Sequence, residues 1–289
     1  MLGKSTIIIP TIDNSDYLQL CINSIKKNSF FHHEIIVHLN GIDIRSEQYL
    51  INSKITYTKT NTNVGLCSGV NIAAKKATTN YIVYSHDDMY YLPKWDYYLF
   101  EEIKILPNNL FYLSGTQISH YPKNKDMINH IFFDVGKNIN DFDESVLLSN
   151  FGKLNFYDLQ GSHWAPHIIH KDVWERVGGF SEEFDPGFGS DPDLNMKLWK
   201  VGVRIFKGVN KSRVYHFGSL TTRKNKNIHR NNGRLTFLLK WKMTMDYFIK
   251  FYLKRGNKYE RPLQEHNLNL SNIIPYFFSK IKYNIKKYL

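Results

Sequence analysis

The alternation of short apolar runs with helical patterns limits how this chain can fold more than any other feature. The β-prone run Ser5–Pro10 is followed by a helical pattern over Asp16–Lys27 and by a second β-prone run at Glu34–Leu39. Such alternation is typical of βαβ units, so we predict an α/β fold with a doubly wound, mostly parallel sheet flanked by helices. Further strands are expected at Ile55–Lys59, Tyr81–Ser85, Phe111–Ile118 and Ile168–His170, and further helices at Leu66–Ala77 and Lys171–Val177.

The run Tyr81–Ser85 ends at two adjacent carboxylates, Asp87 and Asp88. Ligands bind at the C-terminal edge of the strands in α/β sheets, and carboxylate oxygens there suit Mg²⁺ or Mn²⁺. A purely structural alternative stays open, because Asp residues also cap helices and start turns.

A second acidic group follows in Asp185 to Asp193, a Gly-rich and aromatic stretch that carries Asp191 just before a predicted helix. Pro192 fits the first turn of that helix, and acids there are stabilised by the helix dipole. Gly65 and Gly69 likewise begin the helix at Leu66, where they permit either close approach of a ligand or an ordinary turn.

Four blocks follow one another along the chain: Ile7–Thr11, Asn63–Ala77, Ser85–Asp88 and Gly178–Asp193. Taken together and in this order, they resemble a family 2 glycosyltransferase of the GT-A type. The resemblance covers about residues 5 to 220, and it implies a Rossmann-like sheet and transfer of a sugar from a nucleotide-sugar donor.

The resemblance also implies roles for the acidic residues. Asp88 is expected to bind the divalent cation, Mn²⁺ or Mg²⁺, that holds the donor diphosphate, with Asp87 beside it and His216 completing the metal site. Asp191 is expected to be the general base that deprotonates the acceptor hydroxyl, which predicts inversion at the anomeric carbon. Arg223 is expected to close over the diphosphate.

The remaining site residues are assigned by the same resemblance, with two departures. Leu39 stands where the family usually has an Asp that binds the nucleobase, and Val70 stands where it often has an Arg. Base recognition is therefore assigned to other residues, and UDP is favoured as the nucleotide. The expected donor contacts are Pro10, Thr11, Asn40, Asn63, Gly65, Asn71, Asp87 and Arg223, and the expected acceptor contacts are His163, Trp164 and Asp193.

Positive charge is concentrated in residues 226–289, which we call the C-terminal tail. The net charge of the 289 residues is +12, and the tail alone has 14 Lys and Arg against three acids, a net +11. We predict a GT-A domain over residues 1–225 and a basic, mainly helical tail, which is expected either to contact an anionic membrane surface or to pack as helices with solvated charges.

Composition narrows the location and the class of protein. With 42% hydrophobic residues the chain is globular, and two cysteines without metal-type spacing favour a reducing compartment. We expect a cytoplasmic protein, peripheral on the inner face of the membrane. The resemblance implies that it transfers a hexose to a glycan or glycolipid, and we expect this transfer to serve surface polysaccharide or lipopolysaccharide synthesis. The alternatives are a catalytically silent sugar-nucleotide-binding or scaffold protein, and a nucleic-acid-binding protein that uses its basic tail.

Overall fold

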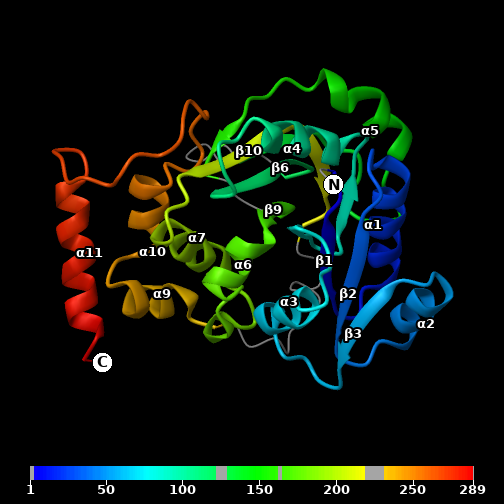
Figure 1. Cartoon of the computed structure of the whole chain (residues 1–289), viewed down its shortest axis with the longest axis horizontal. Coiled ribbons are helices and arrows are strands. Elements are labelled where there is room, and N and C mark those ends of the chain that lie inside the picture. Colours follow the sequence, from blue (N-terminus) through cyan, green and yellow to red (C-terminus); the bar gives the residue numbers. More distant parts are fainter. Residues whose placement is uncertain (1–2, 122–128, 162–164, 219–230, 289) are drawn as a thin grey trace.

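The computed structural model describes residues 3–121, 129–161, 165–218 and 231–288. Its centre is a mixed, mostly parallel sheet in the order β3-β2-β1-β4-β9-β6-β10-β5, with helices on its faces (Figure 1). The predicted α/β fold of the GT-A type is thereby confirmed. The strands are β1 Thr6–Thr11, β2 Glu34–Asn40, β3 Thr56–Thr60, β4 Tyr81–Tyr84, β5 Met89–Tyr91, β6 Phe111–Ser119, β7 His130–Phe132, β8 Leu159–Gln160, β9 His167–His170 and β10 Ile205–His216.

Helices connect these strands and form the C-terminal part of the molecule. Most of the predicted helices begin or end within a few residues of the predicted bounds, whereas α2, α4 and α5 were not predicted. The helices of the described ranges are α1 Ser15–Asn28, α2 Ile44–Asn52, α3 Leu66–Ala74, α4 Trp95–Lys104, α5 Glu144–Asn150, α6 Lys171–Val177, α7 Ser190–Lys200, α9 Gly233–Trp241, α10 Met245–Tyr247 and α11 Ile273–Lys286.

Strand β1 lies inside the sheet, and this position explains why its sequence is so apolar. It pairs in parallel with β2 on one side and β4 on the other, and Ile7, Ile8 and Ile9 are fully buried. A strand covered on both faces reads as a continuous apolar run rather than an alternating one. The parallel pairing also brings the C-terminal ends of β1, β2 and β4 to one edge of the sheet.

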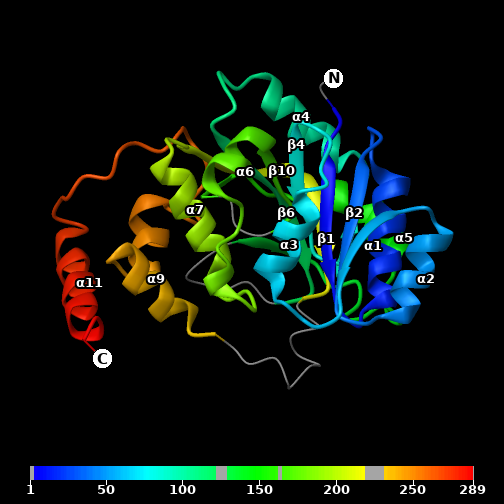
Figure 2. The same cartoon turned by 60° about the horizontal axis from the view of Figure 1, so that its bottom comes forward.

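The C-terminal tail packs against the sheet domain through its first half. Phe237, Phe248 and Leu253 are buried in the same hydrophobic cluster as the strands. Beyond them, residues 254–259 run beside β8, where Leu159 forms an antiparallel bridge with Lys258. Helix α11 then lies at one end of the molecule and α2 at the other in both views (Figures 1 and 2).

A buried hydrogen-bond cluster around Asp96 fastens the loop before β2 to the start of α4. Asp96 accepts hydrogen bonds from the backbone N–H groups of Phe30 and Phe31 and lies 2.9 Å from Nε2 of His33. Burial opposes ionisation of this carboxyl, but the His33 and backbone hydrogen bonds outweigh it and lower the pKa of Asp96. The side chains of Asp96 and His33 are almost completely buried.

We expect Asp96→Ala to lower the free energy of unfolding by about 3 kcal/mol, because it leaves buried donors without an acceptor. Urea denaturation followed by tryptophan fluorescence measures this. Asp16→Ala is the matched control, since Asp16 also lies in the first turn of a helix but forms an exposed pair with Arg45, and it should change stability little. Equal losses in the two variants would contradict this account.

Candidate functional site

The site begins where β4 ends. The backbone of Ser85 still donates to Ile8 of β1, and the chain then turns so that Asp87 and Asp88 are both buried at the sheet edge. Thr11, the last residue of β1, donates from Oγ1 to Oδ2 of Asp87 at 2.6 Å. Burial, together with the charge of Asp88, raises the pKa of Asp87 to about 7. Thr11 and Asp87 therefore form one unit beside Asp88.

Antiparallel pairing between β5 and β10 brings His216 to Asp88. In this pairing His216 is opposite Met89, the residue that follows Asp88, and the backbone N–H of Phe217 donates to the carbonyl of Asp88. Two residues 128 positions apart are thus held together by the sheet itself. Strand β5 has only three residues, but it fixes this contact.

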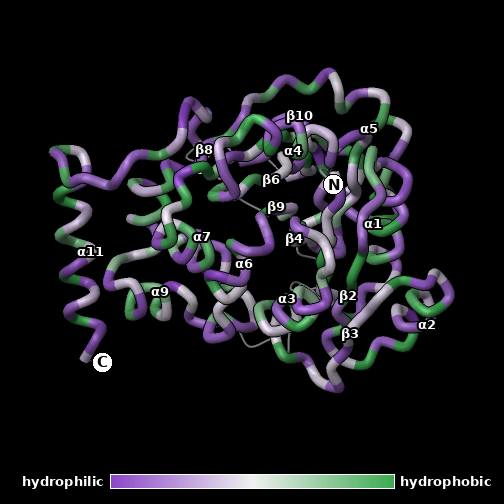
Figure 3. Tube along the Cα trace, viewed as in Figure 1, coloured by the Kyte–Doolittle hydropathy of each residue, from purple (hydrophilic) through white to green (hydrophobic). Residues whose placement is uncertain are grey.

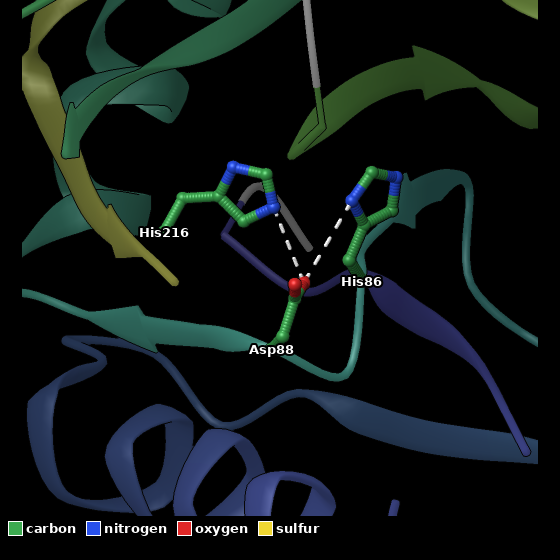
Figure 4. Close-up of side chains that lie close together, drawn as sticks. All are labelled: His86, Asp88 and His216. Carbon is green, nitrogen blue, oxygen red and sulfur yellow. Dashed lines mark ion pairs between the residues drawn. The ribbon is translucent and has the colours of Figure 1, made fainter. Parts of the chain in front are cut away.

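Two imidazoles converge on the Asp88 carboxylate (Figure 4). Oδ1 of Asp88 lies 3.2 Å from Nε2 of His216 and 4.0 Å from Nδ1 of His86. One potential ligand atom from each of the three residues lies within 4.8 Å of the others. His86, which the sequence analysis did not name as a ligand, is therefore a member of the group.

The protonation of these rings suits a cation. Nε2 of Gln117 donates to the carbonyl of Ala165, which leaves its Oε1, 3.2 Å from Nδ1 of His216, as an acceptor. Nδ1 of His216 then carries the proton, so Nε2, which lies 3.2 Å from Oδ1 of Asp88, is the nitrogen that could bind a cation. Burial lowers the pKa of His86 to about 4, so this ring is neutral near pH 7. One carboxylate and two imidazoles are a donor set that fits a divalent transition metal.

Asp191 lies in the first turn of α7. Burial raises its pKa to about 6, and the positive charge of Arg255 opposes that rise. Burial also raises the pKa of Tyr84, and the charges of both Asp191 and Asp88 add to the rise. The two carboxylates therefore lie near the same phenol at the end of β4.

Arg255 is a site residue that the sequence analysis missed. It comes from the tail, where the segment beside β8 buries it to 9% exposure, and Gly161 passes so close that a Cβ there would lie 2.9 Å from its Cα. Burial lowers the pKa of Arg255 while Asp191 and Tyr112 raise it. Its position depends on long-range contacts between the tail and β8, and one arginine among many basic residues gave no sign of them.

The asparagines expected to contact the donor make hydrogen bonds within the protein. Asn40 donates to the carbonyl of Gly65 and accepts from the backbone of Val64, while Asn63 accepts from the backbone of Gly65. Asn71 binds the backbone of Phe180 through both its amide atoms. These side chains shape the loop at the start of α3, and their contacts with a donor stay a prediction, as do those of Pro10.

The start of α3 is occupied by Asp185. Its carboxylate accepts from the backbone of Cys67 and from the backbone and hydroxyl of Ser68. Gly65, at φ +95°, permits this approach, because a Cβ there would lie 2.2 Å from the Asp185 carboxylate. The glycine is thus accounted for by a protein contact, and its contact with a donor also stays a prediction.

Asp193 joins α7 to the tail. Its fully buried carboxylate accepts from the indole of Trp241 at 2.8 Å and from Ser181, and lies 2.9 Å from Nζ of Lys240. Its expected contact with the acceptor stays a prediction. His163, Trp164 and Arg223, also predicted to act at the site, lie outside the described residues.

Comparisons with known proteins fit this geometry. Residues 6–161 match the family described as Glycosyl transferase family 2. The fold is similar to that of residues 1–349 of S. aureus TarS in complex with UDP, with a TM-score of 0.53 and 15% identity over 73% of this chain and 59% of that chain. It is also similar to that of GalNAc-T7 with UDP, GalNAc and Mn²⁺, with a TM-score of 0.59 and 14% identity over 86% of this chain and 50% of that chain.

The structural similarity shows that the fold is shared, whereas sequence identities of 14% and 15% leave the substrates of this chain open. The chain spans 59% of the length of the TarS structure and 50% of that of GalNAc-T7. Each of those structures therefore has a large part without a counterpart in this chain. A search of curated proteins found no match.

Proposed function

This chain belongs to glycosyl transferase family 2, and on that premise we propose that it transfers a sugar, with inversion, from a nucleotide-sugar donor to a hydroxyl of a glycan or glycolipid. The observation that carries the proposal is the cluster of His86, Asp88 and His216 in the neighbourhood of Asp191, a carboxylate whose pKa is raised to about 6. A cation site beside a base near neutral pKa is what such a displacement needs.

The three residues of the cluster would act as ligands, and neighbouring residues would hold them in position. Asp88 and His216 would hold a divalent cation, with Gln117 orienting the His216 ring and His86 as the third ligand. When bound, the cation neutralises the charge that develops on the leaving nucleoside diphosphate. Asp87, bound to Thr11, keeps the loop that carries Asp88 in place.

Asp191 is proposed as the base that takes the proton of the acceptor hydroxyl. It is the ionised form that accepts a proton, and a pKa of about 6 leaves most of the carboxylate ionised at pH 7 while keeping it basic enough to act. Arg255 stays a cation at neutral pH and stabilises that ionised form.

We propose UDP as the nucleotide, a hexose as the sugar and Mn²⁺ as the metal. The support is that the similar fold of TarS was solved with UDP and that of GalNAc-T7 with UDP, GalNAc and Mn²⁺. Two imidazoles in the donor set add to the case for Mn²⁺ over Mg²⁺, which prefers oxygen ligands. We propose that this transfer is a step in the synthesis of a surface polysaccharide or lipopolysaccharide.

We also propose that the catalytic unit extends past the predicted boundary at residue 225. Arg255 reaches the neighbourhood of Asp191, and Trp241 binds Asp193 on the helix that carries Asp191. The part of the tail up to about Leu263, whose buried side chains share the hydrophobic cluster of the sheet, would therefore fold as one unit with it.

The proposed activity is tested by release of nucleoside diphosphate from a panel of UDP-, GDP- and dTDP-sugars with Mn²⁺. We expect turnover of one UDP-sugar and a loss of about 100-fold or more in Asp191→Asn, because the amide cannot take a proton. Asp172→Asn is the matched control, since Asp172 also lies in the first turn of a helix but is exposed. Silence across the panel would contradict the proposal and favour a binding or scaffold protein.

Metal binding is tested separately by the electron paramagnetic resonance of Mn²⁺ titrated into the protein without any donor. Asp88→Asn and His216→Gln should each weaken binding about 10-fold or more, since each removes a ligand. His32→Gln, at an exposed histidine, should bind Mn²⁺ as the unchanged protein does. Undiminished binding in both site variants would place the metal elsewhere.

The pH dependence of kcat/KM tests the environment of Asp191. Activity should fall as the pH drops through about 6, because burial raises the pKa of Asp191 to about 6 and only the carboxylate form is active. Arg255→Met removes the charge that favours the carboxylate, so the acid limb should move to higher pH, whereas Arg255→Lys keeps the charge and should leave the limb near its original position. An acid limb that does not move in Arg255→Met would contradict this role.

A further inference from the structure

Helix α11 carries its apolar side chains on the outside of the molecule. Its exposed apolar residues recur every three or four positions, with one adjacent pair, and at 3.6 residues per turn they fall within an arc of about 100° on one face. Most side chains of this kind are buried in a folded protein. The residues on this face, with their exposed fractions, are Ile274 63%, Phe277 56%, Phe278 68%, Ile281 53% and Ile285 58%, and Tyr288 at 82% continues it beyond the helix.

The opposite face of α11 holds the helix against the body of the protein through polar groups. Ser279 is buried and accepts from the backbone N–H of Thr244 at 2.7 Å. The ring of Tyr276 lies 5.8 Å from that of Tyr247. The helix is therefore attached with its apolar face directed away from the protein, the reverse of a surface helix that covers a core.

Lysines flank the apolar face on both sides. By helical position, Lys282 lies beside one edge of the face and Lys280 beside the other, with Lys286 and Lys287 further round the helix. Nζ of Lys280 donates to the carbonyl of Lys242, whereas Lys282, Lys286 and Lys287 are exposed. The sequence has no acidic residue after Glu265, so α11 contributes no negative charge to balance them. Figure 3 shows the resulting alternation of hydrophobic and hydrophilic residues along this helix.

The length and position of α11 fit attachment to a surface rather than insertion across one. Fourteen residues at 1.5 Å each give about 21 Å, shorter than the roughly 30 Å apolar core of a bilayer. Within the described ranges, no helix is both long and apolar enough to span a membrane. Because α11 lies at one end of the long axis (Figures 1 and 2), its outer face is free to meet a flat surface.

We propose that the outer face of α11 docks this protein on an anionic lipid bilayer, with the aromatic and aliphatic side chains in the headgroup region and the flanking lysines on lipid phosphates. An apolar stripe bordered by lysines is the arrangement that lies in the plane of such an interface. This inference goes beyond sugar transfer and does not depend on which donor is used.

Charge decides between a bilayer and a second copy of the chain as the occupant of this face. If two copies of α11 paired through their apolar faces, the lysines at the edges of each would meet those of the other, with no acid on the helix to offset them. An anionic surface complements the same lysines. The bilayer is therefore the partner that uses both features of the helix.

The test is co-flotation of the full chain with phosphatidylcholine vesicles, with and without about one-third phosphatidylglycerol, so that the surface charge approximates an anionic leaflet. We expect binding to the anionic vesicles and at least 10-fold weaker binding to the neutral ones. Phe278→Glu combined with Ile281→Glu should abolish binding. The matched control is Ile42→Glu combined with Ile44→Glu, two equally exposed residues at the α2 end of the molecule, and it should bind as before.

Two further variants test the charge component. Lys282→Gln with Lys286→Gln should weaken binding to anionic vesicles. Lys75→Gln with Lys76→Gln removes the same charge at exposed sites directly after α3 and should have little effect.

The proposal fails if the unchanged protein binds no vesicles, or if the α11 variants bind as well as the controls. It also fails if light scattering shows a dimer that Phe278→Glu with Ile281→Glu dissociates while vesicles stay unbound. Donor hydrolysis, measured in parallel, should be the same in all variants, so failure of docking is distinguishable from failure of the proposed activity.

Discussion

The antiparallel pairing of β5 with β10 is the contact on which the site depends. It places His216 opposite Met89 and lets Phe217 bond to the carbonyl of Asp88, so a side chain from the end of the sheet domain meets one from its middle. Without this register the carboxylate at the end of β4 would have no imidazole from β10 beside it. A one-residue slip would turn His216 to the opposite face of the sheet, and the cluster of His86, Asp88 and His216 would not form.

A second dependence runs from the sheet to the tail. Asp193 lies two residues after Asp191 on α7, and its buried carboxylate is bound to Trp241 and Lys240 of α9. Arg255, held beside β8, supplies positive charge near Asp191. The proposed base, Asp191, is therefore positioned and electrostatically adjusted by residues outside the segment that matches the family. Its pKa is the net result of burial, which raises it, and of Arg255, which lowers it.

The sequence was sufficient for the parts of the fold that depend on local pattern. The triple isoleucine of β1, the helix start at Leu66 and the acidic end of β4 were all expected, and each is observed. It was insufficient where a position depends on contacts far along the chain. Strand β5 is too short to show a period, and Arg255 resembles its basic neighbours. Asn40 looked available for a ligand because its bond to Gly65 forms only in the folded loop.

The central claim is that this chain binds a nucleoside diphosphate through a metal held by Asp88 and His216. Calorimetric titration of UDP into the protein with and without Mn²⁺, repeated on Asp88→Asn, tests it most directly. The account predicts binding that requires Mn²⁺ and that is lost in Asp88→Asn, because the Asp88 carboxylate would hold the ion and the ion would neutralise the diphosphate charge. Binding of equal strength without metal, or in the variant, would contradict it.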